Sequence, residues 1–310
     1  MLIEFHRRML ADEVRSAAFE AALRRVIRPG ETTVADIGAG TGVLAFMAQR
    51  LGAREVHLVE RGTVIELAAR LADANAIPDL HFWQAESAAI PDPPRVDVVV
   101  AEILGNLALE ENALETLADA RRFLKPGGIL IPARLEQYVA PVTSERPWRE
   151  LASWDRAPLG LDFALAQAMS FDNLYVRPLA PADLLSGDSA RRWDMLDFHS
   201  PPAPHRQGTV RWMPAAAARI FGYALWWRCD LVDGVSLGTS PFGPPTHWEQ
   251  VYAPLATPVA VQAGDVLELT LESETAGMGA GIGMRWTTVH RRNGTVLGHQ
   301  EQNLGRGFIG

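Results

Sequence analysis

The sequence predicts an α/β domain with a doubly wound, Rossmann-like parallel sheet, followed by an antiparallel β-barrel domain with an inserted helical arm. Up to residue 132, strand-like runs alternate with helical patterns, which is typical of βαβ units. After residue 132, short β-like runs are separated by Gly and Pro turns. The 310 residues suffice for two domains of about 100–200 residues each. We therefore expect the domains at 1–132 and 133–310.

The first part has the alternation of a parallel sheet covered by helices. Strands are expected at 33–37, 55–60, 81–83, 96–101 and 129–131, and helices at 9–27, 43–51, 63–76 and 110–123. The run 96–101 is continuously apolar, as in strands that are buried on both faces. Leu10, Val14, Ala17 and Ala21 recur at helical spacing and indicate the apolar face of the first helix.

The second part is typical of an antiparallel barrel. Strands are expected at 137–142, 220–232, 259–261, 266–271 and 284–290. Asp233-Gly234 and Asn293-Gly294 are hairpin turn signals at the ends of two of these strands. A segment at about 160–196, with helix-like and Pro-containing stretches, interrupts the strands and is expected to form the arm.

Net charge and cysteine content exclude several classes of protein. The chain has 29 basic and 37 acidic residues, a net charge of −8, so we expect no nucleic-acid partner. The single cysteine, Cys229, excludes an internal disulfide and a four-cysteine zinc site; we expect a cytoplasmic location and no metal. Since no apolar run approaches the ~18 residues of a spanning helix, we also expect no membrane association.

A glycine-rich loop between the first strand and the following helix indicates a nucleotide-type ligand. Gly38, Gly40 and Gly42 permit close approach of the backbone to a ligand. The dinucleotide fingerprint would place its third glycine at Val43, so an NAD-type loop is the weaker alternative. With Asp36 before the first glycine, the loop resembles motif I of class I S-adenosylmethionine (SAM) methyltransferases.

Two further acidic residues are placed to bind the same ligand. Glu60 closes the second strand, where an acidic side chain can bind both ribose hydroxyls. Glu86 follows the third strand and can accept a hydrogen bond from an adenine amino group. The sequence therefore predicts SAM as the cofactor.

A second pair of carboxylates follows the fourth strand, at the ligand-facing edge of a parallel sheet. Glu102 and Glu111 are nine residues apart, with Gly105 between them, so a hairpin-like loop can present both to one cavity. Two carboxylates in a partly apolar pocket repel each other and favour a cation between them. The planar guanidinium of arginine fits such a pair.

Three segments resemble the protein arginine methyltransferase family. Residues 101–111 are similar to its double-glutamate loop, and Thr246-His247-Trp248, with Gln250 after it, to its "THW loop". Residues 6–15, His-Arg-Arg-Met-Leu-Ala-Asp-Glu-Val-Arg, are similar to its first helix. The resemblance extends over essentially the whole chain and implies transfer of a methyl group to a terminal guanidino nitrogen of a protein or peptide arginine.

The resemblance also implies roles for individual residues. Arg15 would bind the SAM carboxylate, Asp12 would pair with His247, and Met9 would pack by the sulfonium. Trp248 would lie next to the substrate, and either Glu111 or the Asp12–His247 pair would relay the proton. The arm would form a homodimer by contacting the partner's SAM-binding domain.

The departures from the family pattern leave alternatives open. Aromatic positions of the double-glutamate loop are occupied by Ile103, Asn106 and Glu110, and the family's Tyr-Phe-x-x-Tyr segment would precede His6. The first alternative is a methyltransferase that acts on free L-arginine or a guanidino natural-product precursor. The second is a non-catalytic, SAM-binding dimer scaffold.

Overall fold

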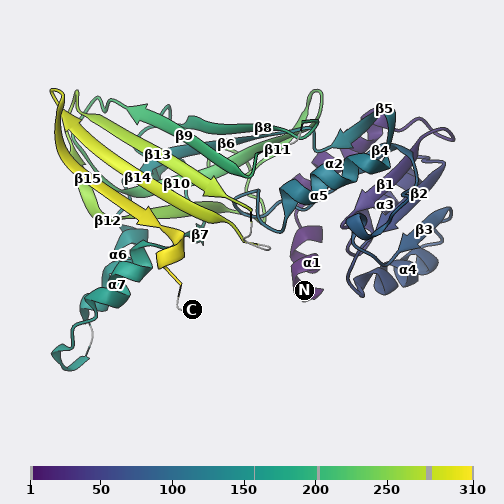
Figure 1. The fold of residues 1–310 in the computed structure, drawn as a ribbon, viewed down its shortest axis with the longest axis horizontal. Helices are drawn as coiled ribbons and strands as arrows, with labels where there is room; N and C mark the ends of the chain where they lie inside the picture. The colour runs from purple at the N-terminus through teal and green to yellow at the C-terminus, as the bar shows by residue number, and fades with distance from the viewer. Residues whose placement is uncertain (1–2, 157, 201–202, 277–280, 309–310) are drawn as a thin grey trace.

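The computed structural model describes residues 3–156, 158–200, 203–276 and 281–308. The chain forms an elongated molecule with the parallel sheet at one end and the antiparallel strands at the other (Figure 1). This arrangement confirms the predicted fold class. None of the helices in the described residues is long and apolar enough to cross a membrane.

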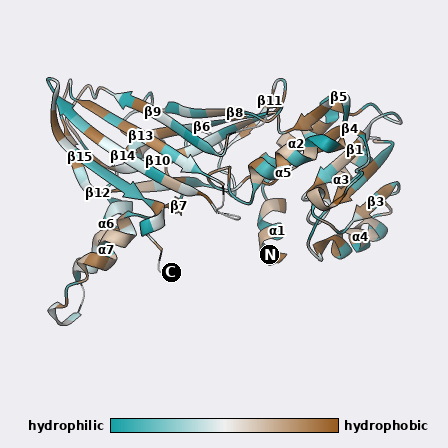
Figure 2. Ribbon diagram, viewed as in Figure 1, coloured by the Kyte–Doolittle hydropathy of each residue, from teal (hydrophilic) through white to brown (hydrophobic). Residues whose placement is uncertain are grey.

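The first part is built on a five-stranded parallel sheet with the strand order β3-β2-β1-β4-β5. Its strands are β1 Thr33–Ile37, β2 Glu55–Val59, β3 Leu80–Trp83, β4 Val96–Val100 and β5 Leu124–Ile131. The connecting helices are α3 Val43–Arg50, α4 Val64–Ala74 and α5 Ala113–Ala120, with 3₁₀ turns at Ser87–Ala89 and Arg121–Phe123. β1 is buried at every position and β4 at all but Asp97; their buried residues are apolar apart from Thr33 and Asp36 of β1, and Figure 2 gives the hydropathy along the sheet.

The predicted helix at 9–27 is two helices, α1 (Ile3–Leu10) and α2 (Glu13–Val26). The break occurs because Asp12 is extended and its carboxylate accepts the backbone N–H of Arg15, which caps α2. The predicted apolar face is also wrong. The buried face of α2 carries Arg15, Phe19, Ala22 and Leu23.

The second part has two antiparallel sheets, β7-β12-β10-β6-β8 with β11 beside β10, and β15-β14-β13-β9. The strands are β6 Arg134–Val142, β7 Tyr175–Arg177, β8 Arg191–Asp197, β9 His205–Trp212, β10 Ala218–Val232, β11 Val235–Gly238, β12 Gln250–Val261, β13 Val266–Glu274, β14 Gly283–Arg292 and β15 Thr295–Asn303. Gly234 (φ 74°), Asn293 (φ 49°) and Gly294 (φ 81°) make the tight turns of the β10–β11 and β14–β15 hairpins.

A helical segment projects from the antiparallel part (Figure 1). It consists of α6 Arg146–Leu151, 3₁₀ turns at Ala152–Arg156 and Pro158–Gly160, and α7 Ala164–Phe171. The helices thus begin earlier than the segment expected at 160–196. Residues 175–177 and 191–197 of that segment belong to β7 and β8, because they pair with β12 and β6.

The core of the first part extends into the second. Trp227 and Cys229 of β10, together with Trp248, pack in the same hydrophobic cluster as the parallel sheet. A separate cluster fills the space between the two antiparallel sheets and includes Trp212, Tyr223 and Trp286. The hydrophobic core is therefore continuous between the parallel sheet and the near end of β10.

Candidate functional site

The glycine loop after β1 has the backbone geometry of a close ligand approach. Gly38, Gly40 and Gly42 have φ values of 75°, 54° and 82°, which an L side chain rarely adopts. A Cβ at Gly38 would lie 2.9 Å from Cγ2 of Ile103, and one at Gly40 3.0 Å from Cε1 of His6. The loop is therefore pressed between α1 and the segment that follows β4.

Asp36 is buried beneath this loop with one carboxylate oxygen unused. Its Oδ2 accepts the backbone N–H of Ala45 at 3.0 Å. None of the residues that the structure describes bonds its Oδ1. Burial raises the pKa of Asp36 to about 7, against the lowering by the Ala45 N–H and by Arg15.

Glu60 at the end of β2 ties the glycine loop to the neighbouring strand. Its Oε1 accepts the N–H of Gly62 at 2.6 Å and its Oε2 the N–H of Gly40 at 3.2 Å. His6 lies over Gly40 with 8% of its surface exposed, and burial lowers its pKa although Glu60 raises it. The sequence analysis did not assign His6 a role; its place six residues before Asp12 was the available signal.

Arg15 and Glu102 form a buried ion pair that connects α2 to the segment after β4. Arg15 Nε and Nη2 donate to Oε2 of Glu102 at 2.7 and 2.5 Å, and each side chain is 5% exposed. Among the described residues, Arg15 Nη1 has no hydrogen-bond partner although it is buried. The sequence analysis missed this pair, and it makes Arg15 a positioning residue for Glu102.

The loop from Glu102 to Glu111 folds back on itself. Gly105 bridges to Ala108, and Ala108 and Glu111 adopt φ values of 68° and 62°. Burial raises the pKa of Glu111, and the charge of Glu102 raises it further, whereas Arg61 lowers it. The Gly105–Ala108 bridge thus folds the segment between Glu102 and Glu111 back on itself. That both carboxylates face one cavity stays a prediction.

Glu110 adds a third acidic group beside the pair. It folds over Gly105, where a Cβ would overlap its carboxyl group, and it accepts the N–H of Leu107 at 2.7 Å. Burial raises the pKa of Glu110 to about 7, against the lowering by backbone N–H groups, and the charge of Glu111 also raises it. Glu110 lines a cavity of about 440 Å³ together with Asn106 and apolar side chains of β7, β12 and the C-terminal segment.

Two tryptophans of the second part hold this loop by its backbone. Trp248 Nε1 donates to the carbonyl of Leu104 at 2.7 Å, and Trp227 Nε1 donates to that of Gly105 at 3.2 Å. The rings meet edge to face with centroids 5.0 Å apart. Asn106 in turn donates to the carbonyl of Trp248. With 4% of its surface exposed, Trp248 is packed against this loop. Its place next to the substrate stays a prediction.

Asp12 and His247 are paired, as the resemblance implies. Asp12 Oδ2 lies 2.8 Å from Nδ1 of His247 and accepts the backbone N–H of the same residue at 2.8 Å. Burial would raise the pKa of Asp12, but the hydrogen bonds from Arg15 and His247 outweigh it and lower the pKa. The pair fixes the loop before β12 against the start of α2.

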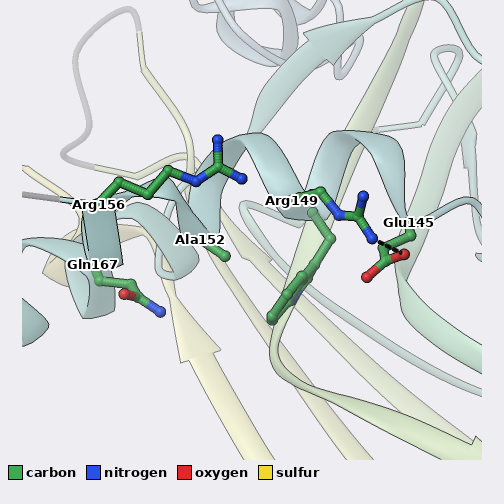
Figure 3. Close-up of a pocket in the computed structure, with 6 residues that line it drawn as sticks. Glu145, Arg149, Ala152, Arg156 and Gln167 are labelled. Atoms are coloured by element: carbon green, nitrogen blue, oxygen red, sulfur yellow. Dashed lines mark hydrogen bonds and ion pairs between the residues drawn. The ribbon is translucent and has the colours of Figure 1, made fainter.

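Glu86 and Met9 are less enclosed than the other candidates. Glu86 pairs with Arg61 at 3.2 Å on the surface, and Met9 is half-buried on α1. A cavity of about 320 Å³ lies elsewhere, on the projecting helices between Glu145, Arg149, Arg156 and neighbouring side chains (Figure 3). Because none of the candidate site residues lines it, we do not include it in the site.

The residues around the glycine loop fit SAM. The unused oxygen of Asp36 and the unused Nη1 of Arg15 are buried polar atoms, which cost free energy unless a ligand satisfies them. Arg15 Nη1 suits a carboxylate, and Glu60 suits ribose hydroxyls. The glycines leave the space that a Cβ would fill.

Comparison with known proteins also indicates a methyltransferase. Residues 20–135 match the family of ribosomal protein L11 methyltransferases (PrmA). Protein arginine N-methyltransferase 6 of Xenopus tropicalis is 29% identical over 277 residues, which cover 84% of this chain and 80% of that protein. The histone-arginine methyltransferase CARMER of Anopheles gambiae is 28% identical over 273 residues, covering 84% of this chain and 44% of that protein.

Solved structures agree on the fold over nearly the whole chain. The PRMT1 enzyme–prozyme heterotetrameric complex of Trypanosoma brucei with AdoHcy has a TM-score of 0.86 at 22% identity and covers 96% of both chains. Protein arginine methyltransferase 10 of Arabidopsis thaliana has a TM-score of 0.82 at 21% identity and covers 98% of both.

The fold and the glycine loop define a methyltransferase. Within that class, the chain resembles the protein arginine methyltransferases along both of its parts, which confirms the resemblance recognised in the sequence.

Proposed function

We propose that this protein transfers a methyl group from SAM to a terminal guanidino nitrogen of arginine in a protein or peptide. The observation that supports the proposal is the folded-back loop from Glu102 to Glu111, whose Ile103 lies against Gly38 of the glycine loop. Two of the relatives are a protein arginine N-methyltransferase and a histone-arginine methyltransferase, which supports the same substrate class.

The cofactor would be held along the edge of the parallel sheet. Its carboxylate would bind Nη1 of Arg15, its ribose Glu60 and its adenine Glu86, while Met9 would pack near the sulfur. Asp36 would hold the glycine loop from below. When bound, SAM would supply a methyl group on a positively charged sulfur for transfer to the substrate nitrogen, leaving S-adenosylhomocysteine.

The two carboxylates would orient the guanidinium by charge-assisted hydrogen bonds. Their negative charge concentrates the positive charge of the guanidinium on the nitrogens that they contact, so the free nitrogen gains lone-pair character. Arg15 fixes Glu102 in this position, and the Trp227–Trp248 pair fixes the backbone of the loop between the glutamates. The acceptor is thus oriented before it reacts.

A proton must leave, because a guanidinium is essentially always protonated at neutral pH. We propose Glu111 as the proton acceptor, since burial and the charge of Glu102 raise its pKa. The Asp12–His247 pair would then be structural.

Free L-arginine or a guanidino natural product is the second candidate substrate. It is favoured by Glu110 and Asn106, which replace aromatic residues of the family pattern and place polar groups along the 440 Å³ cavity. A small cationic substrate could contact both groups.

The arm, the location and the domain limits complete the proposal. Leu161, Phe163 and Leu165 on the arm are 57%, 38% and 87% exposed, which supports a homodimer formed through this arm. Light scattering would give a dimer, and Leu165→Arg would give a monomer.

The single cysteine supports a location in the cytoplasm. Pro132 as the last residue of the first domain fits the end of β5 at Ile131.

The decisive experiment combines cofactor binding with turnover. Calorimetry with SAM is followed by transfer of labelled methyl groups to an Arg-Gly-rich peptide and to free L-arginine. We expect Glu102→Gln and Glu111→Gln to abolish transfer while SAM still binds. The matched control is Glu115→Gln, an exposed carboxylate in the first turn of α5, and it should leave transfer unchanged.

The outcomes distinguish a protein arginine methyltransferase from a small-molecule methyltransferase and from a scaffold. Label on the peptide supports the proposal, whereas label on arginine alone supports the small-molecule alternative. SAM binding without transfer to either acceptor supports a scaffold. Near-normal transfer by both glutamate variants would remove the two-carboxylate mechanism.

A further inference from the structure

A cluster of metal-ligating side chains lies on β2 and β3, outside the proposed site. His57 of β2 and His81 of β3 are directly opposite each other in the parallel pairing. Glu55 is two residues before His57, so its side chain lies on the same face of the sheet. β3 is the edge strand of the sheet (Figure 1), and His81 on it is exposed.

The three side chains converge. One ligand atom from each of Glu55, His57 and His81 lies within 4.8 Å of the others. Nε2 of His81 is 3.8 Å from Oε2 of Glu55, and the two imidazole rings stack with centroids 4.7 Å apart at 20°. Ligand atoms of a tetrahedral zinc site are about 3.3 Å apart, given bonds of about 2.0–2.1 Å. Because a metal lies in the plane of each imidazole that binds it, one ring must turn out of the stack to close the set, and the exposed His81 has the room to do so.

The exposure of the three side chains suits binding of a metal ion. His57 is buried, with 9% of its surface exposed, and provides a fixed ligand. The side chains of His81 and Glu55 are 52% and 36% exposed and can rotate toward it. Their exposure also leaves room for water at the remaining coordination position.

We propose that Glu55, His57 and His81 bind one divalent transition-metal ion, Zn²⁺ or an ion of similar ligand preference. Two imidazoles and one carboxylate are ligands of Zn²⁺, Co²⁺ and Ni²⁺, whereas Ca²⁺ and Mg²⁺ prefer oxygen ligands alone. The sequence analysis predicted no metal. It missed this group because only the register of β2 against β3 brings residue 81 next to residue 57.

The hydrogen bond between Trp83 and His57 makes the fluorescence of Trp83 a reporter of metal binding. Its indole N–H donates to Nδ1 of His57 at 3.3 Å, so without metal the proton of His57 is on Nε2. A metal-bound neutral imidazole keeps a proton on its other nitrogen. Whichever nitrogen of His57 binds the metal, the hydrogen bond from Trp83 is therefore lost, and at 3.3 Å it is a long bond that costs little to give up.

The test uses untagged, chelator-treated protein and does not depend on activity. Co²⁺ is titrated and followed by its visible absorption, and Zn²⁺ is then titrated and followed by tryptophan fluorescence. We expect one equivalent of Co²⁺ per chain, displaced by Zn²⁺. His81→Asn and Glu55→Gln change exposed side chains, so the fold is retained, and each should weaken binding at least about tenfold.

Two variants serve as controls. His205→Asn removes an exposed histidine that lies 3.7 Å from Glu274 but has no second histidine beside it, and it should bind as the unmodified protein does. Trp83→Phe should still bind Co²⁺ but lose the fluorescence response to Zn²⁺. Absence of stoichiometric binding, unchanged affinity in His81→Asn, or an equal loss in His205→Asn would overturn the proposal.

Discussion

Replacement of Arg15 by Met tests the buried ion pair that positions Glu102. Both side chains are 5% exposed, so the variant leaves the carboxylate of Glu102 buried without its cation. Loss of one partner of a buried pair costs about 3–5 kcal/mol in the free energy of unfolding. The guanidinium also lies 5.5 Å from the ring centroid of Phe19, a contact of about 0.5–1 kcal/mol. We expect a total cost of about 4 kcal/mol.

The assay is urea unfolding followed by circular dichroism, without cofactor. The matched control is Arg24→Met on the same helix, whose partner Glu20 is four residues away; these side chains are 65% and 48% exposed. An exposed pair of this spacing contributes only about 0.3–0.5 kcal/mol. The double variant Arg15→Met with Glu102→Met removes both charges and should be more stable than Arg15→Met alone by about 2 kcal/mol.

Two results would refute this reasoning. If Arg15→Met costs no more than Arg24→Met, the pair does not form in solution. If the cost of the double variant equals the sum of its single variants, Arg15 and Glu102 do not interact.

Three further variants test the loops around the site. Burial raises the pKa of Asp36 from 3.8 to about 7, so between about pH 4 and 7 the unfolded chain binds fewer protons and stability falls as pH rises. Asp36→Asn should remove this fall, on the order of 4 kcal/mol, in unfolding measured across pH without cofactor. Glu110→Gln should remove a similar fall of about 3 kcal/mol over pH 4.5 to about 7, because burial raises the pKa of Glu110; an unchanged pH profile would contradict its burial. Gly42→Ala should cost about 2 kcal/mol more than Gly30→Ala, since both have positive φ but only at Gly42 would the Cβ lie 2.8 Å from the Phe46 ring; equal melting shifts would refute this.

The strands that the sequence predicts are those with a clear apolar pattern. The continuous run of β4 and the alternation in β13 are visible because their buried faces are apolar. No such pattern predicts β9 (His205–Trp212), half of whose residues are exposed, or β15 (Thr295–Asn303), whose residues are mostly exposed. Such strands are specified by pairing with their neighbours, and the sequence carries no local signal for it.

At the site, too, contacts between distant residues have no local signal in the sequence. The pairing of Asp12 with His247, 235 residues away, was available only through the family resemblance, and the structure contains it. The ion pair of Arg15 with Glu102 joins residues that are 87 positions apart, and no local pattern in the sequence indicates it. No local pattern tells whether the ring of Trp248 points into the core, where the structure buries it.

The conformation of the loop from Glu102 to Glu111 depends on both parts of the chain. Trp227 and Trp248 belong to the second part, yet their indoles hold the carbonyls of Leu104 and Gly105 in the first. A fragment cut after Pro132 would keep the glycine loop but lose the anchors that shape the segment opposite it. The shape of this loop therefore depends on both parts of the chain, and grafting a foreign barrel onto the first part would require both indoles to come with it.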